Sequence, residues 1–319
     1  MGSRTFNTIV VVFWMATMSW LVVEKVLPPL RVGDPPNYRS ILNQPSPQPP
    51  VCWAIYWNRQ PLGWAATQVK RRDDGMSELQ SRVFFGKVPL DEIAPGWMGA
   101  FVKPVMRQAG RMDMEARSTV EIDPLGRLAG FESRVRMANI RDAIRMRGHM
   151  DGNYLRLTVE SGDVLLKTKK FLPSEALLGD ALSPQGRLPG LRLGQTWTMP
   201  VYNPFLPPSS PMEILQATVE SNELIVWDGK SVMTKLVVYR ADSGSSLLAS
   251  QQTRGKLWVD QDGVVLKQET NMFNSSLMFV RLSPERSEAF SAELNTNRAA
   301  YLSSKRAKLL FSTIKAREP

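Results

Sequence analysis

Strict alternation of apolar and polar side chains is the feature of this sequence that most narrows its possible folds. From Met112 to Ile122, apolar or small residues occupy every second position, with charged or hydroxyl residues between them. This period of two is that of a β-strand with one buried and one wet face. Similar patterns at 144–150 and 155–160, separated by turn residues, predict an antiparallel meander.

The turn at residues 123–126 allows a pairing register to be predicted. If residues 124–126 form a three-residue hairpin loop, Asp123 faces Arg127 and the apolar positions on either side also face each other. Beyond the turn, the inward positions change parity before Phe131. We therefore expect a β-bulge near Gly130.

Strand patterns extend over most of the chain. An opening hairpin is expected from 51–57 and 64–71, with a turn at 58–63, and strands recur as far as residue 270. Helical candidates are few: two short pieces within 90–109 and one turn at 175–178. The fold class is therefore mainly β (α+β): a large curved antiparallel sheet or half-barrel with a few short helices, which we expect in its concavity, over residues 51–282.

The N-terminal region predicts one transmembrane helix, and residues 1–26 are interpreted as a membrane anchor. Thr5 to Val23 would form a helix about 28 Å long, close to the thickness of a bilayer core. A cleaved signal peptide is the alternative, but no pair of small residues suited to cleavage lies between Trp20 and Leu30. The apolar anchor residues are Ile9, Val10, Val11, Val12, Phe13, Trp14, Met15, Trp20, Leu21, Val22 and Val23.

Two flanking regions complete the domain organisation. Residues 27–50 contain eight prolines and predict an extended linker that holds the domain away from the membrane. Ser283 and Pro284 have the chemistry of a helix cap and a first helical position. Residues 283–319 are therefore expected to form a C-terminal helix and a basic tail, either solvated or adhering to an anionic surface.

Composition excludes several functional classes. The net charge of +10 is compatible with nucleic acid or anionic lipid, but it is spread along the chain without any nucleic-acid-binding motif, so no nucleic-acid partner is expected. The single cysteine allows no intrachain disulfide. Basic residues near the anchor number more on its C-terminal side, which by the positive-inside rule favours a cytoplasmic domain, although long domains translocate despite such a bias.

The sequence also offers little for catalysis. Its one histidine, His149, follows an arginine-bearing strand pattern, whereas its one cysteine, Cys52, lies in an apolar strand. A Cys-His pair must lie within hydrogen-bond reach, and zinc needs more ligands than these. No cofactor, metal site or catalytic residue is therefore expected, and a hydrolase that uses only carboxylates is the remaining enzymatic alternative.

Four groups of motifs carry a resemblance to a known kind of domain. They are WAIYW at 53–57 with LGW at 62–64, EIDPLG at 121–126 with FES at 131–133, LPGL at 188–191 with GQTW at 194–197, and LWVD at 257–260 with GVVLK at 263–267. In this order they resemble the β-rich, membrane-anchored domain of uncharacterised planctomycete-type bacterial proteins, which sometimes precedes a transglutaminase-like domain. The meander is more distantly similar to the open half-barrel of periplasmic lipoprotein carriers.

The resemblance implies an extracytoplasmic domain on the cytoplasmic membrane, held by a single span. A transglutaminase-like enzyme would need its own Cys-His-Asp set, and we expect no such domain in this sequence. The expected function is non-catalytic binding of a lipid-like ligand or a lipidated protein in the concavity of the sheet. The alternative is a scaffold module with a protein partner in an envelope complex.

A supply of Met and aromatic residues supports the binding hypothesis, because these broad or flexible side chains suit an adaptable groove, although the same residues also serve as plain core. The candidate groove residues are Trp97, Phe101, Met114, Phe131, Met146, Trp197 and Trp258.

Overall fold

The structure, a computed structural model, covers the N-terminal helix and most of the predicted β region. It describes residues 4–22, 49–89, 111–137, 140–162, 164–173, 176–178, 184–202, 212–241, 253–272 and 275–296. Most of the predicted linker, the helical candidate at 90–109 and the basic tail beyond residue 296 lie outside these residues, so those predictions stay untested.

The N-terminal segment is helical, as expected, but the structure does not support a membrane span. α1 comprises Arg4–Leu21, and its large apolar side chains are exposed. Among the described residues, no helix combines the length and the apolar character that crossing a membrane requires. The transmembrane anchor predicted from Ile9–Val12, Phe13–Met15 and Trp20–Val23 stays a prediction.

One sheet contains every described strand. The strands are β1 Val51–Trp57, β2 Gln60–Arg71, β3 Ser77–Pro89, β4 Arg111–Ile122, β5 Leu128–Met137, β6 Ile140–Asp151, β7 Tyr154–Ser161, β8 Val164–Phe171, β9 Leu177–Leu178, β10 Thr196–Tyr202, β11 Met212–Trp227, β12 Lys230–Ala241, β13 Thr253–Val259, β14 Val265–Met272 and β15 Ser275–Arg281. Their order is β8-β7-β6-β5-β4-β3-β2-β1-β15-β14-β13-β12-β11-β10-β9.

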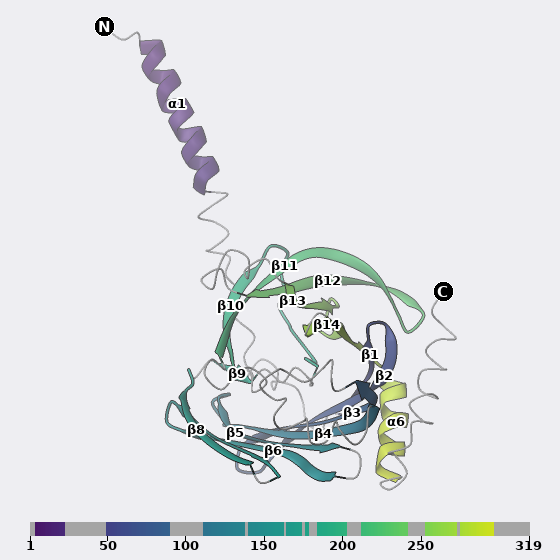
Figure 1. The fold of residues 1–319 in the computed structure, drawn as a ribbon. Coiled ribbons are helices and arrows are strands. Elements are labelled where there is room, and N and C mark those ends of the chain that lie inside the picture. Colours follow the sequence, from purple (N-terminus) through teal and green to yellow (C-terminus); the bar gives the residue numbers. More distant parts are fainter. Residues whose placement is uncertain are drawn as a thin grey trace.

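The sheet is a meander that curls until two halves of it face each other. β1 pairs with β15, so the first and last strands lie in the middle of the sheet, while β8 and β9 end it on either side. All neighbours pair antiparallel except the two-residue β9, which lies parallel to β10. Figure 1 shows the half containing β3–β8 below the half containing β10–β14, with β1 and β2 between them. The predicted curved antiparallel sheet is thereby confirmed in its main features.

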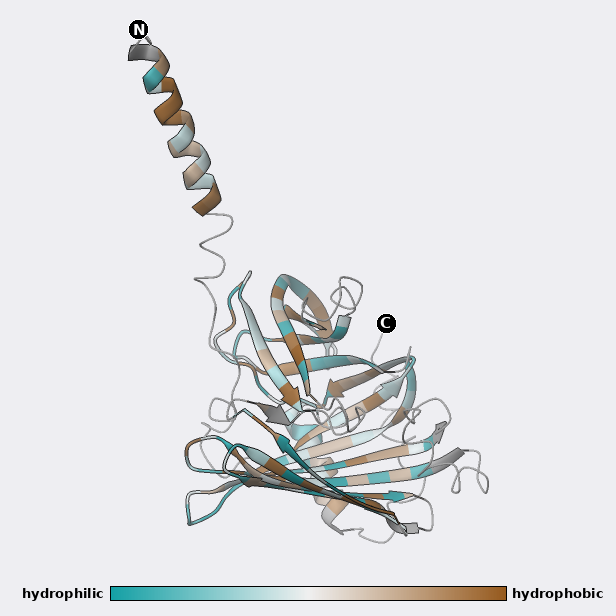
Figure 2. Cartoon of the chain, turned by 60° about the vertical axis from the view of Figure 1, so that its left-hand side comes forward, coloured by the Kyte–Doolittle hydropathy of each residue, from teal (hydrophilic) through white to brown (hydrophobic). Residues whose placement is uncertain are grey.

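The hairpins follow from local chemistry. Asn58 and Arg59 both have positive φ and form a two-residue turn, shorter than the turn expected over 58–63. At the β4–β5 turn, the Asp123 amide donates to the Arg127 carbonyl, as predicted. Residue 129 is then skipped in the pairing, which places a bulge beside Gly130. Apolar and polar residues alternate along the strands in Figure 2, as one buried and one wet face require.

The second described helix covers the outside of the sheet. α6, Pro284–Thr296, begins at the predicted proline. Its Phe290 and Leu294 pack with Cys52, Trp64 and Phe84 in a cluster separate from the interior one. Short helices were expected in the concavity of the sheet, but this described helix lies on the outside. The strand alternation explains its position, because it places Cys52 and Trp64 on the face opposite the interior.

A second local prediction was also wrong. Residues 177–178 form β9 rather than a helical turn, because they pair with Val201 and Tyr202 of β10. Tertiary pairing at the end of a sheet overrides the weak helical preference of so short a segment.

Candidate functional site

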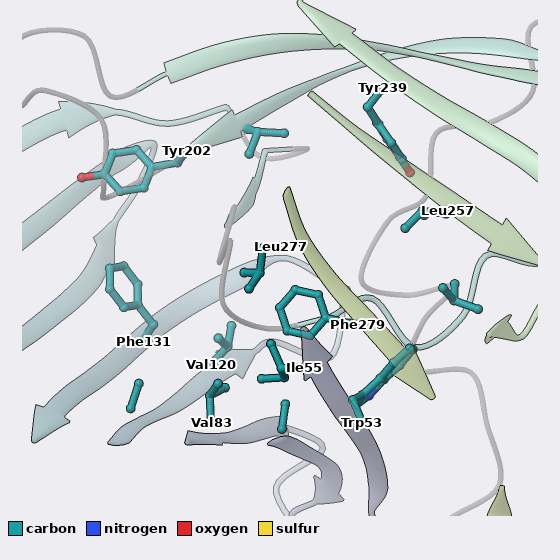
Figure 3. Packing of buried hydrophobic residues seen from close by; sticks show 14 of the residues in the cluster. Trp53, Ile55, Val83, Val120, Phe131, Tyr202, Tyr239, Leu257, Leu277 and Phe279 are labelled. Atoms are coloured by element: carbon teal, nitrogen blue, oxygen red, sulfur yellow. The ribbon is translucent and has the colours of Figure 1, made fainter. Parts of the chain in front are cut away.

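The inner surface of the curled sheet is the candidate site. Side chains from both halves converge on one buried cluster, including Val83, Val120 and Phe131 from one half and Tyr239 and Leu257 from the other. Figure 3 shows these groups directed into the space between the halves, around the central strands β1 and β15. The alternation of each strand brings this face together, because every second residue points inward.

One row of inward residues crosses seven neighbouring strands at the same level. Consecutive register pairs link Trp197 to Ala217, Ala217 to Tyr239, Tyr239 to Gly255, Gly255 to Thr270, Thr270 to Leu277, and Leu277 to Trp57. Directly paired residues in an antiparallel sheet share a face. The row therefore places two indoles, one phenol and one threonine hydroxyl on the inner surface.

Three hydrogen-bond donors in this row lack a partner in the described part of the chain. Trp57 Nε1, Trp197 Nε1 and the Tyr239 hydroxyl are shielded from solvent and bond to nothing within the described residues. The Trp197 and Tyr239 rings meet edge to face, with centroids 6.4 Å apart, a contact that leaves both polar atoms unused. Burial raises the pKa of the Tyr239 hydroxyl, so it keeps its proton. A buried donor without an acceptor costs about 1–3 kcal/mol, and folded proteins rarely leave one unexplained.

A second polar row lies on the inner face of the other half. Thr67, Ser81, Ser118 and Ser133 pair in sequence across β2, β3, β4 and β5. Thr67 and Ser81 are buried, whereas Ser118 and Ser133 are partly accessible although they point inward. The interior surface thus combines broad apolar area with discrete rows of hydrogen-bonding groups, the usual composition of a small-molecule site.

The structure brings four of the predicted groove residues together. Met114, Phe131, Met146 and Trp197 all belong to the interior cluster, on β4, β5, β6 and β10 respectively. Trp97 and Phe101 lie outside the described residues. Whether these side chains line a ligand groove stays a prediction, since packing in a core places them equally well.

The prediction that Trp258 lines the inner groove was wrong, because this residue lies on the outer face. Its neighbours Leu257 and Val259 point inward, so the strand period turns Trp258 outward. There it packs with Leu236 and Val238. Its Nε1 donates to Glu223 Oε2 at 2.7 Å, and it is thus fully accounted for by structural contacts.

Several interior residues were missed at the level of the sequence. Trp53 and Trp57 share the parity of Ile55 in β1, a pattern that could have assigned them to the inner face. Tyr239 also lies in an apolar strand, but only its pairing with Ala217 and Gly255 shows that it stands in the same row as Trp197 and Trp57.

The two candidate nucleophile and base residues lie apart. Cys52 is fully buried under α6, where its Sγ donates to the Ser287 carbonyl at 3.6 Å, and burial raises the pKa of its thiol to about 12. His149 is exposed on β6, and four strands separate it from β1 in the sheet. Within the part of the chain that the structure describes, no three His, Cys, Asp or Glu side chains are grouped to hold a metal ion.

Comparisons with known proteins return structural likenesses alone. No protein-family model and no curated protein matches the chain. A β-barrel-like protein of domain of unknown function DUF1849 from Brucella abortus aligns with a TM-score of 0.44 and 9% identity, over 74% of this chain and 96% of that one. A DUF1089 family protein from Pseudomonas aeruginosa aligns with a TM-score of 0.32 and 17% identity, over 66% and 90%. Neither likeness bears on the planctomycete-type resemblance or on a relation to transglutaminase-like domains.

Proposed function

We propose that the chain is a non-catalytic binding protein whose curled sheet holds an elongated, mainly apolar ligand, such as a lipid chain, in its interior. The observation that carries the proposal is the row containing Trp57, Trp197 and Tyr239, with three buried donors and no acceptor for them among the described residues. A ligand with carbonyl, ester or carboxylate oxygens would supply those acceptors. The apolar cluster around the row would contact the rest of the ligand.

The proposal includes an extracytoplasmic location at the cytoplasmic membrane. The apolar, exposed side chains of α1 support an association of the N-terminal segment with a membrane or a partner. Protease accessibility in intact cells and in spheroplasts would test the location. Digestion of the sheet only after lysis would place it in the cytoplasm.

The first test is native mass spectrometry, with lipid extraction, on the full chain purified from the envelope of a producing cell. A stoichiometric co-purifying lipid is the expected result and would identify the ligand, whether free or attached to a protein. A clean ligand-free mass, with no uptake of added fatty acid or phospholipid, would overturn the proposal and leave the scaffold alternative.

Single aromatic substitutions on the inner and outer faces of the sheet test where the ligand binds. Trp197→Phe and Tyr239→Phe each remove one unpartnered donor while keeping an aromatic ring. Each should weaken lipid uptake by about three- to tenfold if a hydrogen bond to the ligand is lost. Trp258→Phe is the matched control, because its indole lies on the outer face and bonds to Glu223. Equal effects of all three changes would exclude the interior row as the site.

A further inference from the structure

Two arginines meet at one end of the interior. Arg281 is the last residue of β15 and pairs directly with Trp53 of β1, so both side chains lie on the inner face. The Arg281 guanidinium lies 5.7 Å from the centroid of the Trp53 ring, within cation–π distance. Arg187 belongs to an irregular segment that reaches the same place, because its neighbour Gly186 accepts a hydrogen bond from Arg281 Nη1 at 2.9 Å.

Backbone contacts hold the Arg187 segment in position. The Leu188 amide donates to the Gly263 carbonyl at 2.7 Å, and Arg187 forms an isolated bridge with Val264. The Gln185 amide donates to Gln268 Oε1 at 2.9 Å, on the inner face of β14. The position of Arg187 is thus fixed by the sheet rather than by its charge.

Among the residues that the structure describes, neither guanidinium has a carboxylate partner. Within the described residues, no ion pair includes Arg187 or Arg281, and their hydrogen bonds go to carbonyl groups, with Arg187 Nη2 donating to the Asp262 carbonyl at 3.0 Å. Burial and the charge of Arg187 lower the pKa of Arg281 to about 10, while Asp260 has the opposite effect. Asp260 Oδ1 already accepts two backbone amides in its own turn. Two like charges at partly buried positions, without a carboxylate partner among the described residues, are costly to keep together.

Two donors at this place also lack acceptors among the described residues. Arg187 Nε and Trp53 Nε1 are shielded from solvent and have no hydrogen-bond partner within the described residues. Trp53 is completely buried. The group therefore combines two positive charges with two unused donors, which is the chemistry that an oxyanion would satisfy.

We infer that Arg187, Arg281 and Trp53 form a subsite for an oxyanion, the carboxylate or phosphate end of an amphiphilic ligand. Guanidinium groups bind such oxygens through a planar fork of charge-assisted hydrogen bonds. The inference rests on the proposed binding function and makes it more specific: the ligand would be an anionic amphiphile whose charged end lies beside β1 and β15. A free phosphate ion has the same chemistry and is distinguished by experiment.

The test compares palmitic acid with hexadecanol, its neutral counterpart, on the delipidated full chain. The subsite predicts that the unsubstituted protein binds the acid at least tenfold more tightly than the alcohol. Arg187→Gln and Arg281→Gln should remove that difference while binding of the alcohol persists. Arg147→Gln, on an exposed arginine of the outer face, is the matched control and should leave it unchanged.

Melting temperatures separate a ligand site from a structural role. Because each substitution removes an unpaired charge, ligand-free Arg187→Gln should melt no lower than the unsubstituted protein, while the extra stabilisation that palmitic acid gives over hexadecanol is lost. A lower melting temperature with unchanged preference for the acid would overturn the inference. Equal affinity for acid and alcohol in the unsubstituted protein would overturn it as well and leave the proposed function intact.

If the protein binds neither palmitic acid nor hexadecanol, the proposed function is overturned. Calorimetry with inorganic phosphate then tests separately whether the oxyanion subsite exists. Phosphate binding that Arg187→Gln abolishes would support a site for a free anion. No heat of binding would overturn the subsite.

Discussion

The outer face of the sheet differs between two regions: one is covered by a helix and the other is charged. Over β1–β3 it is apolar and α6 covers it, with Trp64 stacked on Phe84 and in edge contact with Phe290. Over β4–β7 the same face carries arginines and carboxylates, and the described residues place no helix on it. Both regions have the same strand period, so the difference arises from the residue type at the outward positions.

Arg82 lies at the boundary between these regions. Its guanidinium lies 5.4 Å from the centroid of the Trp64 ring, and its Nε donates to Glu115 Oε1 at 2.6 Å. Register pairs then link Arg82 to Arg117, Arg117 to Arg134, and Arg134 to Arg145. Like charges directly opposite each other destabilise a sheet. Glu115 and Glu132, which bond to these arginines from adjacent positions, offset that repulsion.

Removing the contact between α6 and the sheet should produce the largest loss of stability. Phe290→Ala deletes a buried aromatic ring between α6 and the sheet, which should lower the free energy of unfolding by about 3–4 kcal/mol. Urea unfolding of the full chain measures it. Glu288→Ala, on the exposed side of α6, should change stability by less than about 0.5 kcal/mol. Similar losses for both would show that α6 contributes helix propensity rather than packing.

Removing the central carboxylate of the charged region should have an intermediate effect. Glu115 is 4% exposed and contacts Arg82, Arg117 and Arg136. Glu115→Gln should cost about 2 kcal/mol, less than a fully buried pair would, because Arg117 is about half exposed and stays solvated.

The same substitution has a pH signature. Burial alone would raise the pKa of Glu115, but Arg82 and Arg117 outweigh it and hold the pKa below its usual 4.5. The ionised carboxylate therefore stabilises the fold above about pH 4.5, and this contribution is lost as the pH falls through the lowered value. The stability difference from Glu115→Gln should shrink in that acid range. A difference that is constant with pH would mean that Glu115 acts through shape rather than charge.

The sequence predicted the local pattern better than the global arrangement. Alternation identified the inner face of β4, and turn chemistry predicted the Asp123–Arg127 contact. The pairing of β1 with β15 was not predictable, because strands more than 200 residues apart carry no local signal for each other. The predicted position of α6 was wrong for the same reason, because the apolar residues of a helix do not indicate which face of the sheet they will cover.

The types of residue in the candidate site were predictable from the sequence, but the individual residues that form it were not. Met114 and Trp197 were expected inside and lie there, yet Trp258 was misplaced by one step of the strand period. Arg187 and Arg281 were not singled out at all, because arginine is normally a surface residue. That the described residues offer them no carboxylate partner is visible only once the fold brings residues 186 and 281 together.

A third prediction concerns Cys52 under α6. Its thiol has a pKa of about 12 in the folded protein against 9.0 for an exposed cysteine, because burial disfavours the thiolate. Above pH 9 the unfolded chain loses this proton while the folded protein keeps it, so stability falls by about 1.4 kcal/mol per pH unit up to pH 12. Unfolding at pH 8 and pH 10, with Cys52→Ala as the reference, isolates the effect. An equal pH dependence in both proteins would show that the thiol is solvated.

The smallest effect is expected in the exposed part of the charged region. Arg147 Nη2 lies 2.5 Å from Glu160 Oε1, with both side chains more than one-third exposed. Glu160→Gln should therefore lower the free energy of unfolding by no more than about 0.5 kcal/mol, and added salt should erase the change. A loss above about 1.5 kcal/mol that persists in salt would contradict this. It would mean that the arginines and carboxylates act as one cooperative network, so that the uncovered face stabilises the sheet as strongly as the face under α6.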